Sequence, residues 1–374
     1  MKARPFAAGA SVVLAAAVLA GCAGGGEDAA ASGAEPTRAK ATATLPADQR
    51  TPEGTLLVAD FGSDTVTFVD PERGPVESVK VGTAPYGIAV GEDGRAWVAT
   101  ADAVAVVDTG TRERVDRIPY ETDSGPVTTG EYRGGGMGIA LSPDGEHAYV
   151  GVNVPDGKGT LEVIDTGERE VTDTVPVGRR PFDVDVSKDG KEVYATNHDS
   201  FDVTVVRADS LAPRRIEVAP YGTEGGLGSW LKPHYAAVRP SDGKLLLPFE
   251  GEKLVVLDPS TGESAIEKMT ANTHQHGARI TPDGTLFAVG TGPIDPSTDE
   301  GPSLTMRTKD GEEKVFPLDG PHEDVAVSED GATAYVTGGF TRDGFWNGIT
   351  VINVKNGDTH RLPAGERPLG VVVL

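Results

Sequence analysis

Four of the seven histidines in this 374-residue chain occur in short polar segments that are far apart in the sequence. They are His198 in Thr-Asn-His-Asp, His234 in Lys-Pro-His-Tyr, His276 in His-Gln-His-Gly and His322 in Gly-Pro-His-Glu. Imidazole nitrogens are good ligands for Zn²⁺ and Cu²⁺, so the four side chains predict a transition-metal site if the fold brings them together. In the competing interpretation, these positions only need a flat side chain for packing.

Aromatic residues form a second set of candidates, because they lie in long Gly-rich or polar segments. The five are Tyr120, Tyr132, Trp230, Phe340 and Trp346. Aromatic rings over a concave surface are common in carbohydrate, peptide and small-molecule sites. We therefore expect these residues to bind a small ligand or a partner protein, unless they pack beneath their own loops.

Familiar catalytic motifs are absent from the sequence. It contains no G-x-S-x-G elbow, no P-loop, no H-E-x-x-H zinc motif and no dinucleotide-binding glycine pattern. Cys22 is the only cysteine, so neither an intrachain disulfide nor a cysteine-based metal site can form. Motifs therefore assign no catalytic residue.

The elements that must position these side chains repeat seven times along the chain. Each copy is a polar turn ending in Gly, followed by a short apolar run, as in Pro143-Asp-Gly-Glu-His-Ala-Tyr-Val-Gly151. The glycines of the seven turns are Gly54, Gly94, Gly145, Gly190, Gly243, Gly284 and Gly331. They are spaced 40 to 53 residues apart, a period typical of propeller blades.

Each repeat reads as four antiparallel strands, with Asp-Gly supplying positive φ angles for a tight hairpin between the first and second. The first repeat has no innermost strand before its turn, whereas Arg367–Leu374 reads as an innermost strand with no turn after it. We therefore predict an all-β, seven-bladed propeller over residues 52–374, in which the C-terminal strand closes the first blade.

This architecture predicts where the candidate residues lie. The loops entering the innermost strands and those between the second and third strands share one face of a propeller. His198, His234, His276 and His322 belong to four successive repeats, so we expect them on one sector of that face. The five aromatic candidates fall in long loops of the same two kinds.

The segments Ala334-Tyr-Val-Thr337 and Tyr194-Ala-Thr-Asn197 resemble the YVTN-type β-propeller repeat of surface-layer and periplasmic YncE-like proteins. This resemblance implies the fold and says little about activity. The segments around His234 and His276 are similar to strand starts in lactonase-like propellers. That similarity implies an alternative function as a metal-dependent hydrolase, although no complete catalytic set can be carried over.

The N-terminus reads as an export signal. Residues 1–21 combine Lys2 and Arg4 with an apolar stretch, and Leu19-Ala-Gly-Cys22 resembles a bacterial lipobox, which implies lipidation of Cys22. Residues 22–51 are rich in Ala, Gly, Ser, Thr and Pro, which predicts a flexible tether. We expect an extracytoplasmic protein that is lipid-anchored to the cell membrane.

The net charge of −23 argues against nucleic acid as a partner, because such a surface repels phosphate backbones. We expect a monomer that binds a small molecule or a protein on its loop-rich face. The alternative is a metal-dependent enzyme that uses the rim histidines with Zn²⁺ or Cu²⁺.

Overall fold

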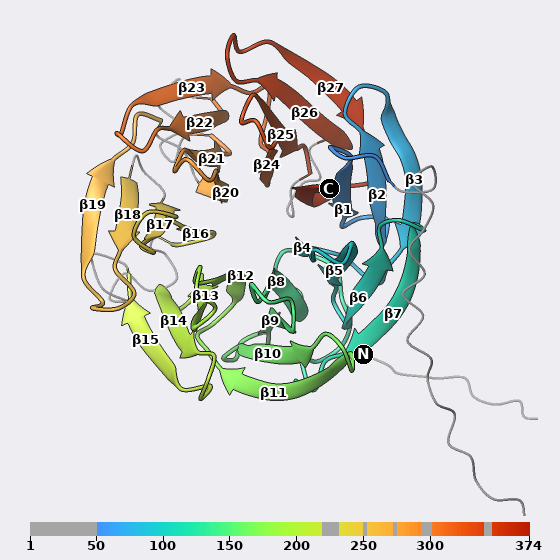
Figure 1. Cartoon of the computed structure of the whole chain (residues 1–374), viewed down its shortest axis with the longest axis vertical. Coiled ribbons are helices and arrows are strands. Elements are labelled where there is room, and N and C mark those ends of the chain that lie inside the picture. The colour runs from blue at the N-terminus through green and yellow to red at the C-terminus, as the bar shows by residue number, and fades with distance from the viewer. Residues whose placement is uncertain (1–50, 219–231, 250–252, 272–274, 293–300, 340–345) are drawn as a thin grey trace, which may run out of the picture. The chain divides into compact units, whose positions relative to one another are not determined.

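The computed structural model describes residues 51–218, 232–249, 253–271, 275–292, 301–339 and 346–374. These residues belong to one compact unit, Leu45–Leu374, and their regular structure consists of strands. The strands form seven four-stranded antiparallel sheets arranged in a ring (Figure 1). No helix in this part of the chain is long and apolar enough to cross a bilayer.

The seven sheets are the blades, and their strands are named here from the axis outward. The innermost strands of blades 1 to 7 are β28 (Pro368–Val373), β4 (Ile88–Val90), β8 (Gly135–Leu141), β12 (Pro181–Val186), β16 (Ala237–Val238), β20 (Gln275–Ile280) and β24 (Val325–Val327). The second strands are β1 (Leu56–Asp60), β5 (Arg95–Ala99), β9 (His147–Asn153), β13 (Glu192–Asn197), β17 (Leu245–Phe249), β21 (Leu286–Gly290) and β25 (Thr333–Thr337). The third strands are β2 (Thr65–Asp70), β6 (Ala103–Asp108), β10 (Thr160–Asp165), β14 (Asp202–Arg207), β18 (Lys253–Leu257), β22 (Ser303–Arg307) and β26 (Gly348–Asn353). The outermost strands are β3 (Gly74–Lys80), β7 (Glu113–Pro119), β11 (Glu170–Pro176), β15 (Pro213–Glu217), β19 (Ser264–Lys268), β23 (Glu313–Pro317) and β27 (Thr359–Pro363).

The Asp-Gly turns join the first and second strands of blades 2 to 7, as predicted, and Glu53-Gly54 precedes the second strand of blade 1, but only the Gly has a positive φ. The seven glycines have φ angles between 68° and 91°, whereas the preceding residues stay at negative φ. In blade 3, the Gly145 amide donates to the Ser142 carbonyl at 2.9 Å, and the Asp144 carboxylate accepts the Ser142 hydroxyl at 2.5 Å. Asp therefore stabilises the turn through its side chain, while Gly provides the left-handed conformation.

The last strand closes the ring by joining the first blade. Strand β28 pairs antiparallel with β1 in the register Leu56↔Val373 and Val58↔Val371. The backbone amide of Gly54 also donates to the carbonyl of Leu374 at 2.8 Å. The predicted closure by the C-terminal strand is confirmed, and it gives β1 a hydrogen-bonded partner on its inner side.

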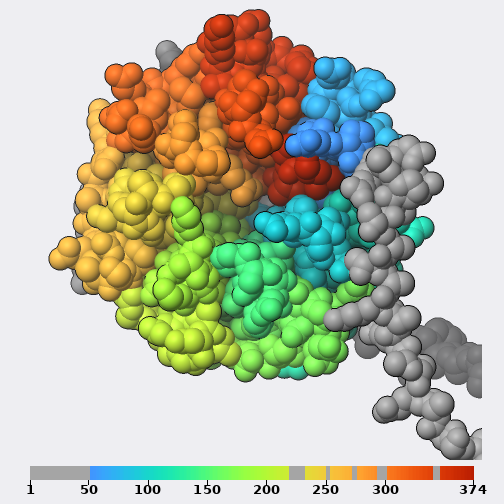
Figure 2. All heavy atoms as spheres, viewed as in Figure 1, coloured from blue at the N-terminus to red at the C-terminus, as the bar shows by residue number. Residues whose placement is uncertain are grey.

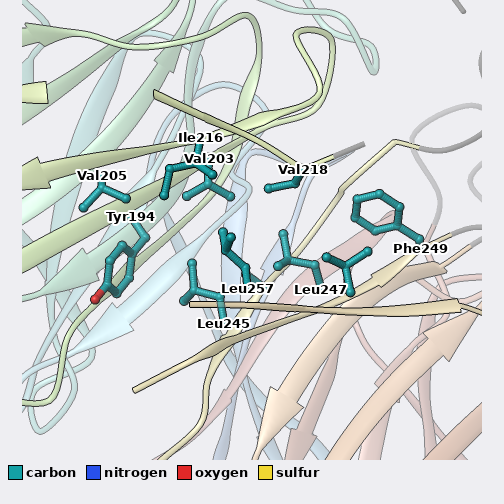
Figure 3. Close-up of a cluster of buried hydrophobic side chains, with 11 residues drawn as sticks. Tyr194, Val203, Val205, Ile216, Val218, Leu245, Leu247, Phe249 and Leu257 are labelled. Atoms are coloured by element: carbon teal, nitrogen blue, oxygen red, sulfur yellow. The ribbon is translucent and has the colours of Figure 1, made fainter. Parts of the chain in front are cut away.

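The core is divided among the junctions between neighbouring blades. At the junction of blades 4 and 5, Tyr194, Val203 and Val205 pack against Leu245 and Leu247 (Figure 3). Six further apolar clusters occupy the other six junctions of the ring. Each blade is therefore stabilised mainly by its two neighbours, which makes ring closure important for the whole domain.

Aromatic and apolar side chains fill part of the axis. Phe61, Tyr86, Phe182, Met137 and Leu369 form a buried cluster that is contributed by several blades. On the side of the Asp-Gly turns, which we call the hairpin face, the innermost strands surround an axial cavity of about 640 Å³. In Figure 2 the ring is hollowed at its centre. The opposite side, formed by the loops that enter the innermost strands and those between second and third strands, is the loop face.

Candidate functional site

A pocket of about 260 Å³ lies on the loop face at blades 3 and 4. Five loops build it, namely β7–β8, β9–β10, β11–β12, β13–β14 and β15–β16. We call it the loop-face pocket, and its lining residues are Tyr132, Asn153–Gly157, Arg179, Arg180, Asp199 and Lys232. All five loops belong to the two kinds that the repeat pattern assigned to this face.

Arg180 is the most buried cation of the pocket, with 9% of its surface exposed. The carbon at the centre of its guanidinium lies 3.7 Å from the centroid of the Tyr132 ring, so the two planar groups stack. Its Nη2 atom pairs with Asp199 Oδ2 at 2.8 Å. Its Nε and Nη1 atoms are buried without a hydrogen-bond partner among the described residues. Unsatisfied buried donors cost about 1–3 kcal/mol each, so this arrangement favours an acceptor in the pocket.

Asp199 connects the pocket to one of the predicted histidines. Its Oδ1 lies 2.6 Å from Nδ1 of His198 and 3.9 Å from Nζ of Lys232. Burial raises the pKa of Asp199, but the hydrogen bond from His198 and the charges of Arg180 and Lys232 outweigh it and hold that pKa below its usual range. The carboxylate is therefore ionised at neutral pH, and Nδ1 of His198 must donate to it.

Burial also sets the charge of His198. The side chain is 4% exposed, and desolvation lowers its pKa to about 4 even though Asp199 opposes this shift. His198 is consequently neutral at pH 7, with its hydrogen on Nδ1 and its lone pair on Nε2. It forms a hydrogen-bonded His–Asp pair at the edge of the loop-face pocket.

Three of the four predicted histidines come together, namely His198 of this pair, His234 and His276. His234 lies between the other two rings, with centroids 4.4 Å from His198 and 4.7 Å from His276. His276 extends the group to blade 7, where its Nδ1 lies 3.3 Å from Glu323 Oε1. Glu323 also accepts a hydrogen bond of 2.9 Å from the Tyr86 hydroxyl.

His322 does not join this group. Its Nδ1 lies 2.7 Å from the Gly320 carbonyl, to which it donates, and its Nε2 accepts the Thr350 hydroxyl at 2.8 Å. Burial lowers the pKa of His322 to about 4, so the ring is neutral and both nitrogens are used within blade 7. The prediction that four imidazoles converge is therefore wrong for His322, because both of its ring nitrogens are hydrogen-bonded within blade 7 and neither has a lone pair for a shared ligand.

The stacking of His234 on His276 also differs from the geometry of a metal site. Lone pairs of imidazole lie in the ring plane, and the rings of His234 and His276 are inclined by only 22°. The lone pairs of these two stacked rings therefore lie in nearly parallel planes and do not meet at one point. Among the described residues, no group of three or more His, Cys, Asp or Glu side chains has an arrangement that could hold a metal ion. A site that includes residues outside the described ranges, such as His274, stays a prediction.

The predicted aromatic residues have different surroundings. Tyr132 lines the loop-face pocket and is 53% exposed. The Tyr120 hydroxyl donates to the carbonyls of Thr100 and Ala103 at 2.9 and 2.8 Å, so this ring serves the packing of blade 2 instead of a pocket.

Trp346 also packs within its own blade. A side chain at either Gly338 or Gly348 would overlap its indole ring, and the Arg361 guanidinium lies 4.7 Å from that ring. This position matches the alternative in which the aromatics pack beneath their own loops. Trp230 and Phe340 lie outside the described residues.

The larger axial cavity contains acidic side chains that hold neighbouring blades together. Asp183 of blade 4 accepts the Ala236 amide of blade 5 at 2.9 Å, and Asp324 of blade 7 accepts the Val371 amide of blade 1 at 3.2 Å. Burial raises the pKa of both carboxyls to about 6. Their hydrogen bonds give these carboxylates a structural role, and the loop-face pocket is the stronger candidate site.

The charged residues of the pocket were not predicted from the sequence. Gly178-Arg-Arg-Pro181 places two adjacent cations at the entry to an innermost strand, and Asp199 directly follows a predicted histidine. Both features are visible in the sequence, but neither indicates which other loops complete the pocket. Lys232 reaches the same carboxylate from a loop of the next blade.

Fold and topology together define the chain as a seven-bladed β-propeller. The periplasmic gluconolactonase PpgL of Pseudomonas aeruginosa superposes with a TM-score of 0.61, covering 85% of this chain and 98% of that chain at 14% identity. Hydrazine synthase of Kuenenia stuttgartiensis gives a TM-score of 0.60, with 77% and 89% covered at 17% identity. Virginiamycin B lyase of Staphylococcus aureus gives 0.54, with 83% and 91% covered at 16% identity. At such identities the likeness concerns the fold alone. No protein-family model and no curated protein sequence matches the chain.

Proposed function

We propose that this protein is an extracytoplasmic propeller that binds a small ligand in the loop-face pocket. The observation that carries the proposal is the enclosure of a cluster of charged side chains by five loops from neighbouring blades. Rigid blades fix the ends of these loops, which is how propellers and other scaffolds position binding residues. The volume of about 260 Å³ lies just below the roughly 300–1,000 Å³ of drug-sized sites, so the ligand is small.

The proposal includes attachment to the membrane. Lipidation of Cys22 in Leu19-Ala-Gly-Cys22 would anchor the chain, and residues 22–51 would separate the propeller from the bilayer. The resemblance to YVTN-type and YncE-like repeats agrees with this location. We further propose that the protein acts as a monomer, since ring closure by β28 already satisfies the first blade.

A screen with a blocked pocket tests the proposal. Pro155 is an exposed residue of the pocket wall, so Pro155→Trp should fill the mouth without entering the core. Glu168→Trp adds the same ring to an exposed turn of the hairpin face and is the matched control. The full-length protein and both variants would be screened by ligand-observed NMR against neutral, anionic and cationic small molecules.

We expect ligands that bind the wild type and Glu168→Trp but not Pro155→Trp. Ligands of any charge that follow this pattern support a binding pocket. If the library yields no ligand, or if all ligands bind Pro155→Trp equally well, the proposed function is wrong. Thermal unfolding of the three proteins verifies that the added ring has not disrupted the blades.

The His198–Asp199 pair favours hydrolysis as a second candidate function. A neutral histidine whose Nδ1 is held by a carboxylate can use its Nε2 lone pair as a general base, and the low pKa of His198 makes it a weak one at neutral pH. A lactone-hydrolysis assay with and without added divalent metal tests this activity. Turnover that is lost in both His198→Gln and Asp199→Asn would establish the enzyme, and no turnover above background would exclude this reaction.

A further inference from the structure

We infer that the loop-face pocket recognises a carboxylate on a small organic molecule, and that Arg180 is the residue that binds it. This inference rests on the proposed function and names the chemical class of its ligand. Three features support it, namely the unused donors of Arg180, the loop position that this residue occupies and the net charge of the pocket wall.

The guanidinium of Arg180 has three N–H bonds on its Nε and Nη1 atoms, and none of them meets an acceptor among the described residues. Stacking on Tyr132 uses the face of the guanidinium and leaves these in-plane donors unaffected. The pairing of Nη2 with Asp199 fixes the orientation of the group. The pocket therefore presents a preoriented cation whose hydrogen-bonding capacity is incompletely used.

Arg133 illustrates what a structural arginine looks like in this fold. It is 2% exposed, and its Nη1 donates to the Gly134 carbonyl while its Nη2 donates to Ala84 and Gly136. Only its Nε lacks a partner. In Arg180, by contrast, both Nε and Nη1 lack an acceptor among the described residues, and Nη2 pairs with the side chain of Asp199.

The backbone at this position does not require arginine. Arg180 precedes Pro181 at the entry to an innermost strand and has a φ of 54°. Ala84 and Arg367 also precede a proline at the entry to blades 2 and 1, with φ angles of 50°. Because alanine adopts the same conformation, the guanidinium is not needed to form the turn.

The charge of the pocket favours an anion with a single charge. Its wall has the cations Arg179, Arg180 and Lys232 and the anions Asp156 and Asp199, which leaves one positive charge. The rest of the chain is strongly acidic, with a net charge of −23 for the whole sequence. A monoanionic carboxylate balances this charge, and the Tyr132 ring and Pro155 offer an apolar surface to the remainder of the molecule.

Binding of simple probes to the full-length protein tests the inference. Propionate carries the carboxylate, propionamide has the same shape without charge, and inorganic phosphate is the alternative oxyanion. The variants are Arg180→Ala, which Ala84 indicates will keep the turn, and Arg180→Lys, which keeps the charge but loses the planar donors. Arg73→Ala removes an equal charge from a side chain that is 82% exposed and serves as the matched control.

We expect propionate to bind in NMR titrations at least about tenfold more tightly than propionamide, because a charged acceptor strengthens each hydrogen bond. Arg180→Ala should abolish binding, Arg180→Lys should weaken it about tenfold, and Arg73→Ala should leave it within about twofold of wild type. Equal binding of propionamide, tighter binding of phosphate, or propionate binding that survives Arg180→Ala would overturn the inference.

The two proposals fail in distinguishable ways. If neutral or cationic ligands bind and Pro155→Trp excludes them, while propionate does not bind, the proposed binding pocket stands and the inference of a carboxylate ligand is refuted. If propionate binds Pro155→Trp as tightly as wild type, the loop-face pocket is not its binding site, whatever the Arg180 variants show.

Discussion

Asp60 provides a test of how burial controls the stability of the closing blade. It ends β1 and is fully buried, and its carboxylate accepts the Thr65 and Thr67 hydroxyls at 3.0 and 2.5 Å. Its other oxygen accepts the Gly365 amide at 2.9 Å, just before the closing strand. Burial raises the pKa of Asp60 to about 6, although the three hydrogen bonds oppose this shift.

The size and sign of the effect follow from linkage. The pKa of Asp60 rises from its ordinary value of 3.8 to about 6 in the folded chain, and each pKa unit corresponds to about 1.4 kcal/mol. Between these two values the folded state binds more protons than the unfolded state, so the free energy of unfolding falls as pH rises. Between pH 4 and pH 8, ionisation of Asp60 should therefore reduce that free energy by about 2–3 kcal/mol.

Asp60→Asn should remove this dependence while keeping the shape. The amide oxygen can still accept the Gly365 amide, and the amino group can donate to the Thr67 hydroxyl, which has Ser78 Oγ at 2.8 Å as another partner. Relative to wild type, the variant should gain about 2–3 kcal/mol between pH 4 and pH 8. At about 2.1 cal/mol/K per residue and roughly 320 residues, this corresponds to a difference of about 3–4 °C in Tm.

Thermal unfolding followed by circular dichroism at pH 4, 5, 6, 7 and 8 measures this difference. Subtracting the two curves removes the contributions of other groups that titrate in this range, including Asp183 and Asp324. Asp310→Asn, at an exposed turn, is the matched control and should shift Tm by less than about 1 °C at every pH. If the Tm difference between Asp60→Asn and wild type is the same at pH 4 and pH 8, the reasoning from burial is refuted.

Three further predictions concern closure, anchoring and metal binding. Leu369→Ala, in the fully buried part of the closing strand, should cost about 2–5 kcal/mol and lower Tm by about 3–7 °C, whereas Val76→Ala at a half-exposed site should change Tm by less than about 1 °C; equal Tm values would contradict the closure argument. Cys22→Ser should release the protein from washed membranes, and unchanged retention on immunoblots would exclude the lipid anchor. Calorimetry with Zn²⁺ and Cu²⁺ should show weaker binding for a His234→Ala/His276→Ala double variant if these rings bind metal, and equal titrations would assign them to packing.

The repeat pattern predicted most of the architecture because each blade is encoded locally. Asp-Gly turns and short apolar runs define consecutive hairpins, and neighbouring hairpins bury their apolar faces against each other. The missing innermost strand at Thr51 and the extra one at Arg367–Leu374 together predicted the closure. The turn geometry was only partly predicted, because the Asp acts through its carboxylate and does not adopt a positive φ.

The candidate site was less predictable, since a position on the loop face does not determine the direction of a side chain. Sequence placed His198 and His322 on the same rim, but a carbonyl and a hydroxyl of its own blade use both nitrogens of His322. Tyr120 likewise donates to carbonyls of its own blade, although it was expected in a binding site.

The sequence by itself determined the number of blades, the order of their strands and the face on which the loops lie. Those features depend on periodic apolar residues and turn chemistry within about 40–50 residues. Only the tertiary structure brought Tyr132, Arg180, Asp199 and Lys232 into one pocket, because four loops contribute them and two of their three contacts cross blade junctions. Whether a buried nitrogen meets a carbonyl or remains available to a ligand depends on these contacts, and no local pattern encodes them.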